Sequence, residues 1–358
     1  MHKFLALALF VIGVITPFAF PQPVEDSIEL ERWRVMIGDN EAFSQAGFDD
    51  SGWEQVSLPW QARSEGYVAW ARTELPRVPA DRYAIWFSKI NGVVDVFVDG
   101  QRVYSHGREE PLFYMKGAPK LTALPDNAGA GTVVAIRMYS ESGVFELPVA
   151  LLAPYDQMLG TYRLFEVLDV HLFFAFALLA LFIGLYHILQ FILNRNDKKS
   201  LFFGIANLGL FIYFLDIGWI VPSFPLVLFR AIAKGGMTIF FTSLTLFFLE
   251  SYKVLDGAIT RIAVTTVGAL VFLAFPILGS NTDVINTLFT LSLLPAAIEI
   301  IYMLVASIIA VLRKVPRSWP VLVGVAVGLM SAVHDFAWQL AIPGDPAIWM
   351  QGFGVFFF

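Results

Sequence analysis

Residues 170 to 199 decide the fold, and they read VHLFFAFALLALFIGLYHILQFIL followed by NRNDKK. The first part of this stretch carries no Asp, Glu, Lys or Arg. A helix needs about 20 apolar residues to cross the hydrocarbon layer of a bilayer, so this segment is long enough to span it. The charged NRNDKK sequence marks the point at which the chain returns to water. The pattern predicts a membrane-spanning helix with a basic connection after it.

The same alternation of apolar segment and short connection continues to the end of the chain. The further segments are 200 to 221, 224 to 249, 259 to 279, 284 to 312, 319 to 342 and 347 to 358. The final one has twelve residues, or roughly 18 Å of helix, so we expect the chain to be cut within a seventh span. A hydrophobic content of 57% and a mean hydropathy of +0.66 agree with this class. We therefore expect an all-α seven-helix transmembrane bundle over residues 168 to 358, with its seventh helix truncated.

Basic residues predict the orientation of this bundle. Alternate connections hold eight Lys and Arg residues, while the connections between them hold none. The eight are Arg195, Lys198, Lys199, Lys253, Arg261, Arg313, Lys314 and Arg317. Because cytoplasmic loops of membrane proteins are enriched in Lys and Arg, we expect these connections in the cytoplasm. The region before the first span then lies outside, which for a bacterial inner membrane is the periplasm.

The amino terminus has the outline of a secretory signal, with Lys3, an apolar run from Phe4 to Ile15, and a break near Pro17 and Ala19. We expect residues 1 to 21 to be a signal peptide, with an uncleaved signal anchor as the alternative. Residues 22 to 160 then form the exported domain. The chain contains no cysteine, so this domain has no disulfide and its apolar core must hold it together.

Short alternating runs predict an all-β exported domain. In residues 94 to 104, VDVFVDGQRVY, Val94, Val96 and Val98 share one face, and Asp-Gly supplies the positive φ angles of a two-residue hairpin turn. Residues 132 to 138 form a second probable strand. Strands at this spacing over about 130 residues are typical of a two-sheet sandwich.

The motifs of this domain resemble the sugar-binding jelly-roll (galactose-binding-like) domain of family 2 glycoside hydrolases. They are FDDSGW at 48 to 53, VSLP at 56 to 59, AWAR at 69 to 72, the hairpin described above and VAIR at 134 to 137. The resemblance implies a jelly roll in which Asp49, Asp50 and Trp53 form a structural turn. Glycoside cleavage needs a pair of carboxylates in a catalytic domain, and no such domain follows the sandwich. We therefore expect residues 1 to 358 to have no enzymatic activity, no catalytic residues and no metal or cofactor.

A carbohydrate or another small ligand would need exposed aromatic rings beside fixed polar groups. The candidates are Trp60, Tyr67, Trp70, Arg72, Tyr104 and His106. For any one of them alone, core or rim packing fits better than contact with a ligand.

Ionisable residues inside the predicted spans form a second candidate site, because such residues are costly in a bilayer and face the bundle interior. They are Asp216, Arg230, Lys234, His334, Asp335 and Glu299. Arg230 and Lys234 are four residues apart and so share a helix face. We expect Asp216 or Asp335 to pair with one of them in an outward-facing polar cavity; the alternative is a static set of pairs that fixes helix orientation.

The whole arrangement resembles the seven-transmembrane receptors with diverse intracellular signalling modules, with local likenesses at 196 to 204 and 351 to 353. The resemblance implies a transmembrane signal receptor that senses a ligand, such as a carbohydrate, outside the cytoplasm. Its helices would relay the signal to a cytoplasmic effector in cis, such as a diguanylate cyclase or a histidine kinase. By analogy we expect a homodimer in contact with membrane lipid. The net charge of −6 gives no basic stripe for a nucleic-acid partner. The alternative function is a transporter or channel with an exported substrate-capturing domain.

Overall fold

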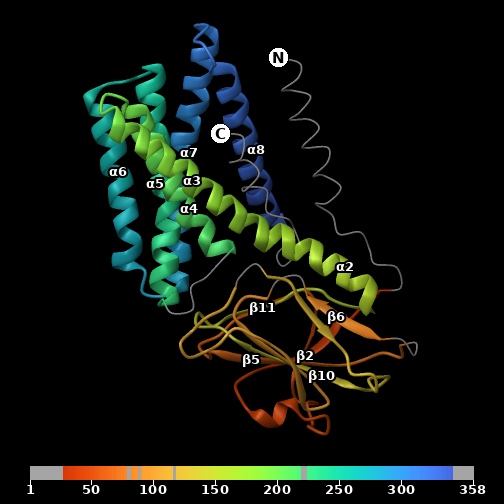
Figure 1. Ribbon diagram of the computed structural model, residues 1–358. Coiled ribbons are helices and arrows are strands. Elements are labelled where there is room, and N and C mark those ends of the chain that lie inside the picture. The colour runs from red at the N-terminus through yellow and green to blue at the C-terminus, as the bar shows by residue number, and fades with distance from the viewer. Residues whose placement is uncertain (1–26, 79–81, 88–89, 116–117, 219–223, 342–358) are drawn as a thin grey trace. The chain divides into compact units, whose positions relative to one another are not determined.

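The computed structural model describes residues 27–78, 82–87, 90–115, 118–218 and 224–341, with side chains up to residue 334 (Figure 1). The expected signal peptide and the expected seventh span lie outside these residues. Contacts divide the chain into two compact units, one that ends at Val170 and one that begins at His171.

The first unit contains two larger antiparallel sheets that share one apolar core. The first sheet has the order β1 (Ile28–Glu29), β12 (Ala150–Pro154), β6 (Tyr83–Phe87) and β9 (Lys120–Ala123). The second has the order β3 (Glu54–Ser57), β2 (Arg32–Ile37), β5 (Val68–Glu74), β10 (Val133–Tyr139), β7 (Val93–Val98) and β8 (Gln101–His106). The strands β11 (Val144–Leu147) and β4 (Trp60–Arg63) form a separate pair.

The hairpin β7–β8 shows how the sequence specifies this unit. Asp99 and Gly100 have φ values of 47° and 86°, as the two-residue turn requires. The Asp99 carboxylate also accepts a hydrogen bond of 2.9 Å from the backbone N–H of Val133, which ties the turn to β10. Val94, Val96 and Val98 all point into the core, so the predicted face of this strand is confirmed.

The second unit is made of long helices, and the helical run that leads into it begins within the first unit, at Tyr155 rather than at the expected residue 170. A continuous helical run covers α2 (Tyr155–Glu166), the π-helical turn η3 (Val167–His171) and α3 (Leu172–Leu193). The other helices are α4 (Lys198–Gly218), α5 (Leu226–Tyr252), α6 (Ala258–Leu278), α7 (Thr282–Leu312) and α8 (Ser318–Ala341). Among the described residues, five helical runs, the last of them Thr282–Leu312, are long and apolar enough to cross a membrane.

Glycine allows α4 and α5 to pack most closely. A Cβ atom on Gly236 would lie 2.5 Å from the carbonyl oxygen of Gly209, so the two backbones meet without side chains between them. About half or more of the apolar part of α4 and α5 is buried, against 11% for α6. The connections α3–α4, α5–α6 and α7–α8 lie at the same end of this unit (Figure 1).

Candidate functional site

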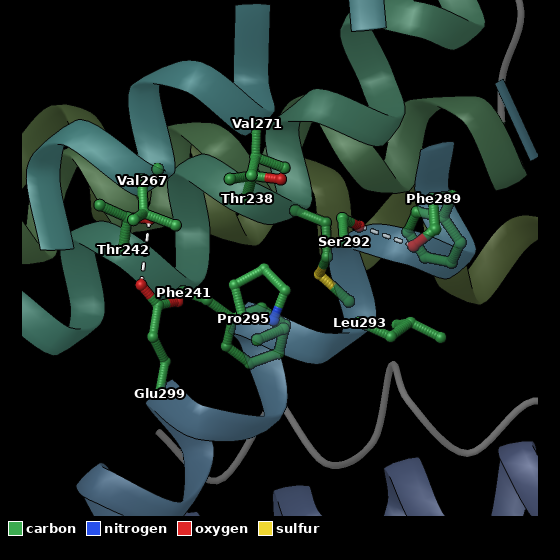
Figure 2. Close-up of a pocket in the computed structure, with 13 residues that line it drawn as sticks. Thr238, Phe241, Thr242, Val267, Val271, Phe289, Ser292, Leu293, Pro295 and Glu299 are labelled. Atoms are coloured by element: carbon green, nitrogen blue, oxygen red, sulfur yellow. Dashed lines mark hydrogen bonds between the residues drawn. The ribbon is translucent and has the colours of Figure 1, made fainter. Parts of the chain in front are cut away.

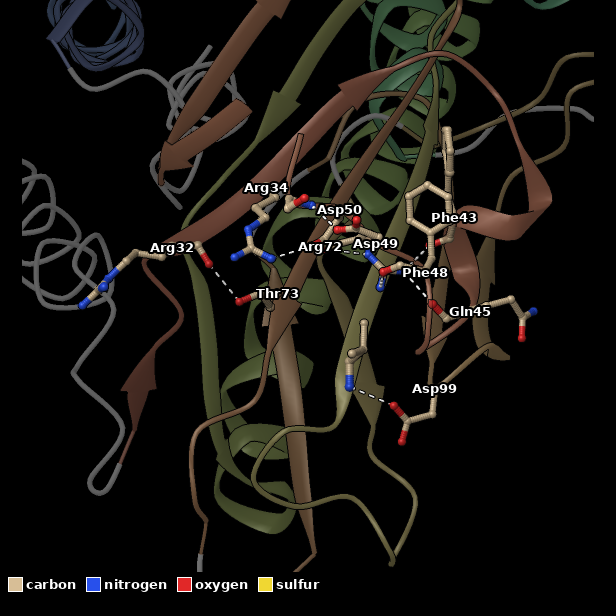
Figure 3. Close-up of polar contacts among 12 residues, drawn as sticks. Arg32, Arg34, Phe43, Gln45, Phe48, Asp49, Asp50, Arg72, Thr73 and Asp99 are labelled. Carbon is tan, nitrogen blue, oxygen red and sulfur yellow. Dashed lines mark hydrogen bonds and ion pairs between the residues drawn. The ribbon is translucent and has the colours of Figure 1, made fainter. Parts of the chain in front are cut away.

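Arg72 is the anchor of the long loop that covers the outer face of the six-stranded sheet (Figure 3). Its guanidinium is 2% exposed and lies 2.9 Å from the Asp50 carboxylate, which also pairs with Arg34. It donates further to the backbone oxygens of Phe43, Gln45 and Phe48. Every one of these partners belongs to the segment between β2 and β3, so Arg72 fastens that segment to β5.

The FDDSGW motif forms the turn that the sequence predicts. The Asp49 carboxylate accepts a hydrogen bond from the backbone N–H of Ser51 at 3.0 Å, and this bond holds the pKa of Asp49 below its usual value. Trp53 is buried against Phe43 and Phe48. Asp50 differs from the expectation, because its side chain binds the two arginines rather than nearby backbone.

A second charged group lies next to the first on the same face of the sheet, around Arg137, which is opposite Trp70 in the register of β10 and β5. Arg137 on β10 pairs with Asp39 and with Glu109, and the Trp70 indole donates to Asp39 at 3.2 Å. The hydrogen bonds from Arg137 are the main cause of the lowered pKa of Asp39. Through Asp50 and Asp39, the two groups hold the covering loop on this face of the sheet by ion pairs and hydrogen bonds.

The six candidates for ligand contact do not form one site. Trp70 and Arg72 are 1% and 2% exposed and are covered by the loop, so the expectation that they edge an open pocket needs correction. Trp60 and Tyr104 pack against the sandwich core. Tyr67 is 59% exposed in the connection before β5. Burial and the nearby Lys120 charge lower the pKa of His106 to about 4, and its imidazole is bonded to the backbone of Met115.

The structure does bring three of the polar residues of the helical unit together. The Asp216 carboxylate at the end of α4 lies 3.7 Å from the Arg230 guanidinium and 3.5 Å from the Lys234 ammonium, both on α5. All three side chains are buried or nearly so. One carboxylate therefore faces two cations that are one helical turn apart, and neither distance is that of a close hydrogen-bonded pair.

Aromatic rings complete the surroundings of Lys234. Its ammonium lies 5.2 Å from the ring centre of Tyr213 and 4.8 Å from that of Phe289, and the two rings are stacked. The π faces of such rings attract a cation, most strongly where water is excluded. Arg230 also reaches α7, with its guanidinium 3.4 Å from the Thr282 hydroxyl.

Glu299 occupies a different place, in a small cavity between α5, α6 and α7 (Figure 2). The Thr242 hydroxyl lies 3.3 Å from its carboxylate. Pro295, one turn earlier on α7, cannot donate a backbone hydrogen bond and so interrupts the helix beside the cavity. The volume of about 20 Å³ is enough for about one water molecule.

A polar stripe on α5 links the two places. Arg230, Lys234, Thr238 and Thr242 follow each other at intervals of four residues, and α7 faces them with Thr282, Phe289, Ser292 and Glu299. Phe289 both contacts Lys234 and lines the Glu299 cavity. His334 on α8 is partly buried, and the side chain of Asp335 lies outside the described residues.

Sequence reasoning missed the neutral members of this stripe. Thr238 and Thr242 continue the four-residue spacing of Arg230 and Lys234, and that spacing is the signal that could have found them. Gly268 was also missed; a Cβ atom there would lie 2.2 Å from the Thr242 hydroxyl, so only glycine lets α6 approach this position.

Comparison with known proteins gives distant structural neighbours only. No protein-family model and no curated protein matches the sequence. A glycoside hydrolase family 2 member from Bacteroides cellulosilyticus is 17% identical, with a TM-score of 0.31, over 35% of this chain and 20% of its own. A β-glucuronidase from glycoside hydrolase family 2 is 12% identical, with a TM-score of 0.29, over 35% and 17%. A Ruminococcus gnavus β-glucuronidase in complex with D-glucuronic acid is 13% identical, with a TM-score of 0.28, over 38% and 30%.

The match thus spans less than a third of each of these enzymes. Likenesses this weak assign neither an activity nor a ligand to the chain.

Proposed function

We propose that this chain is the sensory part of a bacterial membrane receptor. In this proposal the β unit is a jelly roll in the periplasm, the helices cross the inner membrane, and a cytoplasmic effector in cis receives the signal. The five apolar helices support the membrane location, and the basic residues at one end of the helical unit support its orientation.

The observation that carries the receptor function is the shared carboxylate of Asp216. Because Arg230 and Lys234 are one turn apart, a closer pair with either of them corresponds to a different position of α4 along α5. Two such positions are the kind of alternative arrangement that signalling helices use. A ligand bound outside would shift the population between them only through different affinities for the two arrangements.

The absence of native cysteines makes this proposal directly testable. Spin labels on cysteines at the exposed positions Leu193 and Leu312 would report the distance between the basic ends of α3 and α7. Asp216→Asn removes the carboxylate and is expected to change the distance distribution, whereas Lys234→Arg keeps the charge and is expected to retain it. Identical distributions in the wild type and in Asp216→Asn would contradict a switching role.

Orientation has its own experiment. Lys198→Cys is expected to react with a membrane-impermeant maleimide only after the cytoplasmic face is opened. Tyr67→Cys, in an exposed loop of the β unit, is expected to react in intact spheroplasts. The reverse pattern would overturn the topology and with it the receptor proposal.

The polar stripe on α5, together with Glu299 on α7 at its end, favours a second candidate function, ion- or proton-coupled transport. Polar groups that line up between two helices can conduct a proton or small ion, and a broken helix is common at such sites. The chain reconstituted in liposomes would then dissipate a pH gradient, and Glu299→Gln would abolish this flux while Glu166→Gln would not. A gradient that persists with the wild-type chain would count against transport.

A further inference from the structure

A second cavity in the helical unit lies away from the Asp216 and Glu299 sites, at the basic end of the bundle. It has a volume of about 300 Å³, which is within the range of small-ligand sites. His187 on α3 lines one part of it, and Asp197, Lys199 and Ser200 at the start of α4 line another. Neither function proposed above uses these residues.

The polar side of this cavity is organised. The Ser200 hydroxyl donates to Asp197 at 2.7 Å, and its backbone N–H is bonded to the same carboxylate at 3.3 Å. These bonds lower the pKa of Asp197, which thus stays ionised as the N-terminal cap of α4. Within the described residues the Nδ1 atom of His187 is buried without a hydrogen-bond partner, and the ring is held against Phe203 at 4.8 Å between ring centres. Lys199 and His187 are the basic residues in the lining of this cavity.

The opposite side of the cavity is apolar. Phe203 on α4, Leu244 and Phe247 on α5, and Val321 in the first turn of α8 supply it. A ligand that fits both sides has a polar head and an apolar tail.

Charge at this end of the bundle selects the sign of the head. In the α5–α6 connection, Lys253 and Arg261 each form ion pairs with both Glu250 and Asp256, so that corner is neutralised internally. The connections 194 to 199 and 313 to 318 instead hold six cations and one carboxylate. The second of these leads directly into α8, which contributes Val321 to the cavity. The excess positive charge thus lies in the two connections that lead into lining residues of this cavity, Lys199 and Val321.

We propose that the cavity binds an anionic membrane phospholipid, with the headgroup phosphate at Lys199 and His187 and the start of an acyl chain against Phe203 and Phe247. Basic pockets between helices at this membrane surface are suited to phosphate headgroups. The lipid would join α3, α4, α5 and α8 at the end from which a signal leaves, and it would hold these helices together there. This inference goes beyond the receptor function and does not need it.

Binding can be measured on the purified chain in detergent by native mass spectrometry and by thermal unfolding. Phosphatidylglycerol is expected to bind and to raise the unfolding temperature more than phosphatidylcholine does. Lys199→Gln is expected to weaken phosphatidylglycerol binding by about fivefold, the effect of one lysine charge near a lipid surface. Lys198→Gln, an equal charge change on a neighbouring residue outside the cavity lining, is the matched control and is expected to change binding less than twofold.

Shape is tested by a variant without charge change. Val321→Phe is expected to fill the apolar side and to weaken phosphatidylglycerol binding, and Leu244→Phe serves the same purpose if that variant does not fold. Equal losses in Lys199→Gln and Lys198→Gln would indicate unspecific attraction and overturn the site. Equal binding of phosphatidylcholine, or full competition by inorganic phosphate, would overturn the assignment to an anionic lipid. Because no signal or transport is measured, these outcomes are independent of the fate of the receptor proposal.

Discussion

The Lys234 ammonium on α5 lies 3.5 Å from the Asp216 carboxylate on the neighbouring helix α4. The Arg230 guanidinium, one helical turn before Lys234 on α5, lies 3.7 Å from the same carboxylate. The group therefore carries one negative and two positive charges in a place with little water. Its stability depends on the carboxylate more than on either cation, because the carboxylate is the member shared by both pairs.

Replacing Asp216 by Asn should thus cost more than replacing Lys234 by Met. We expect a loss of about 3 kcal/mol in unfolding free energy for Asp216→Asn, since it leaves buried cations without their carboxylate. Lys234→Met leaves the Arg230 pair intact and should cost less. The double variant is expected to be more stable than additivity predicts by about 1 kcal/mol or more. Unfolding of the chain in detergent and SDS mixtures measures all three, and strict additivity would mean that the two residues are not coupled.

The contact between Gly236 and Gly209 makes a second prediction. A methyl group on Gly236 would lie 2.5 Å from a backbone oxygen that cannot move away alone, so Gly236→Ala must push α4 from α5. We expect a destabilisation of about 1 to 3 kcal/mol and a weaker coupling between Asp216 and Lys234. Gly160→Ala on α2 is the control, because nothing lies within 4 Å of its added Cβ. That variant should be neutral or stabilising by up to about 1 kcal/mol, and similar losses in both would refute the packing argument.

The sequence was a good guide to elements with strong periodicity. The hairpin turn at Asp99 and Gly100 and the expected helix from 284 to 312 were found because turn chemistry and apolar length are local properties. The pairing of Asp216 with α5 could be expected, since a buried carboxylate needs a cation. That Asp216 meets both Arg230 and Lys234 could not be predicted, because it depends on which helices are neighbours.

The role of Arg72 was beyond sequence reasoning for a different reason. Its partners lie 22 to 29 residues earlier in the chain, and three of them are backbone oxygens that no residue pattern reveals. A buried arginine on a strand resembles a ligand-binding arginine in sequence. The early start of the helix at Tyr155 was missed because residues 155 to 166 mix polar and apolar side chains and so resemble the end of the β unit.

Loss of Arg72 should release the covering loop. Arg72→Met removes the buried one of the two arginine partners of Asp50 and the donor to three backbone oxygens, and we expect a cost of about 3 to 5 kcal/mol to the β unit. Arg72→Lys keeps the charge but cannot make the same set of bonds, so its effect should be intermediate. Hydrogen exchange of the amides between 40 and 53 in the full chain would show the release. Arg102→Met is the control, because its 62% exposed side chain forms only a surface pair with Asp95 and should cost less than about 1 kcal/mol. Unchanged protection in Arg72→Met would show that the loop is held by its aromatic residues alone.

His106 gives the β unit a pH dependence with a defined sign. Burial, and the Lys120 charge after it, lower its pKa to about 4 in the folded chain, whereas the ordinary value is 6.5. Between these two values the unfolded chain binds more protons than the folded chain does. The stability that comes from neutral His106 is therefore complete above pH 6.5 and declines as the pH falls toward 4.

Denaturation followed by tryptophan fluorescence at pH 7 and pH 5 can isolate this contribution. We expect the wild-type β unit to lose between about 1 and 2 kcal/mol over this interval through His106. His106→Gln does not titrate, and its amide oxygen can accept the Met115 N–H that the imidazole now binds at 3.3 Å. The variant should thus lose less stability on acidification, whatever its absolute stability at pH 7. An equal loss in the two proteins would mean that His106 is already accessible to protons in the folded chain and that other groups cause the pH dependence.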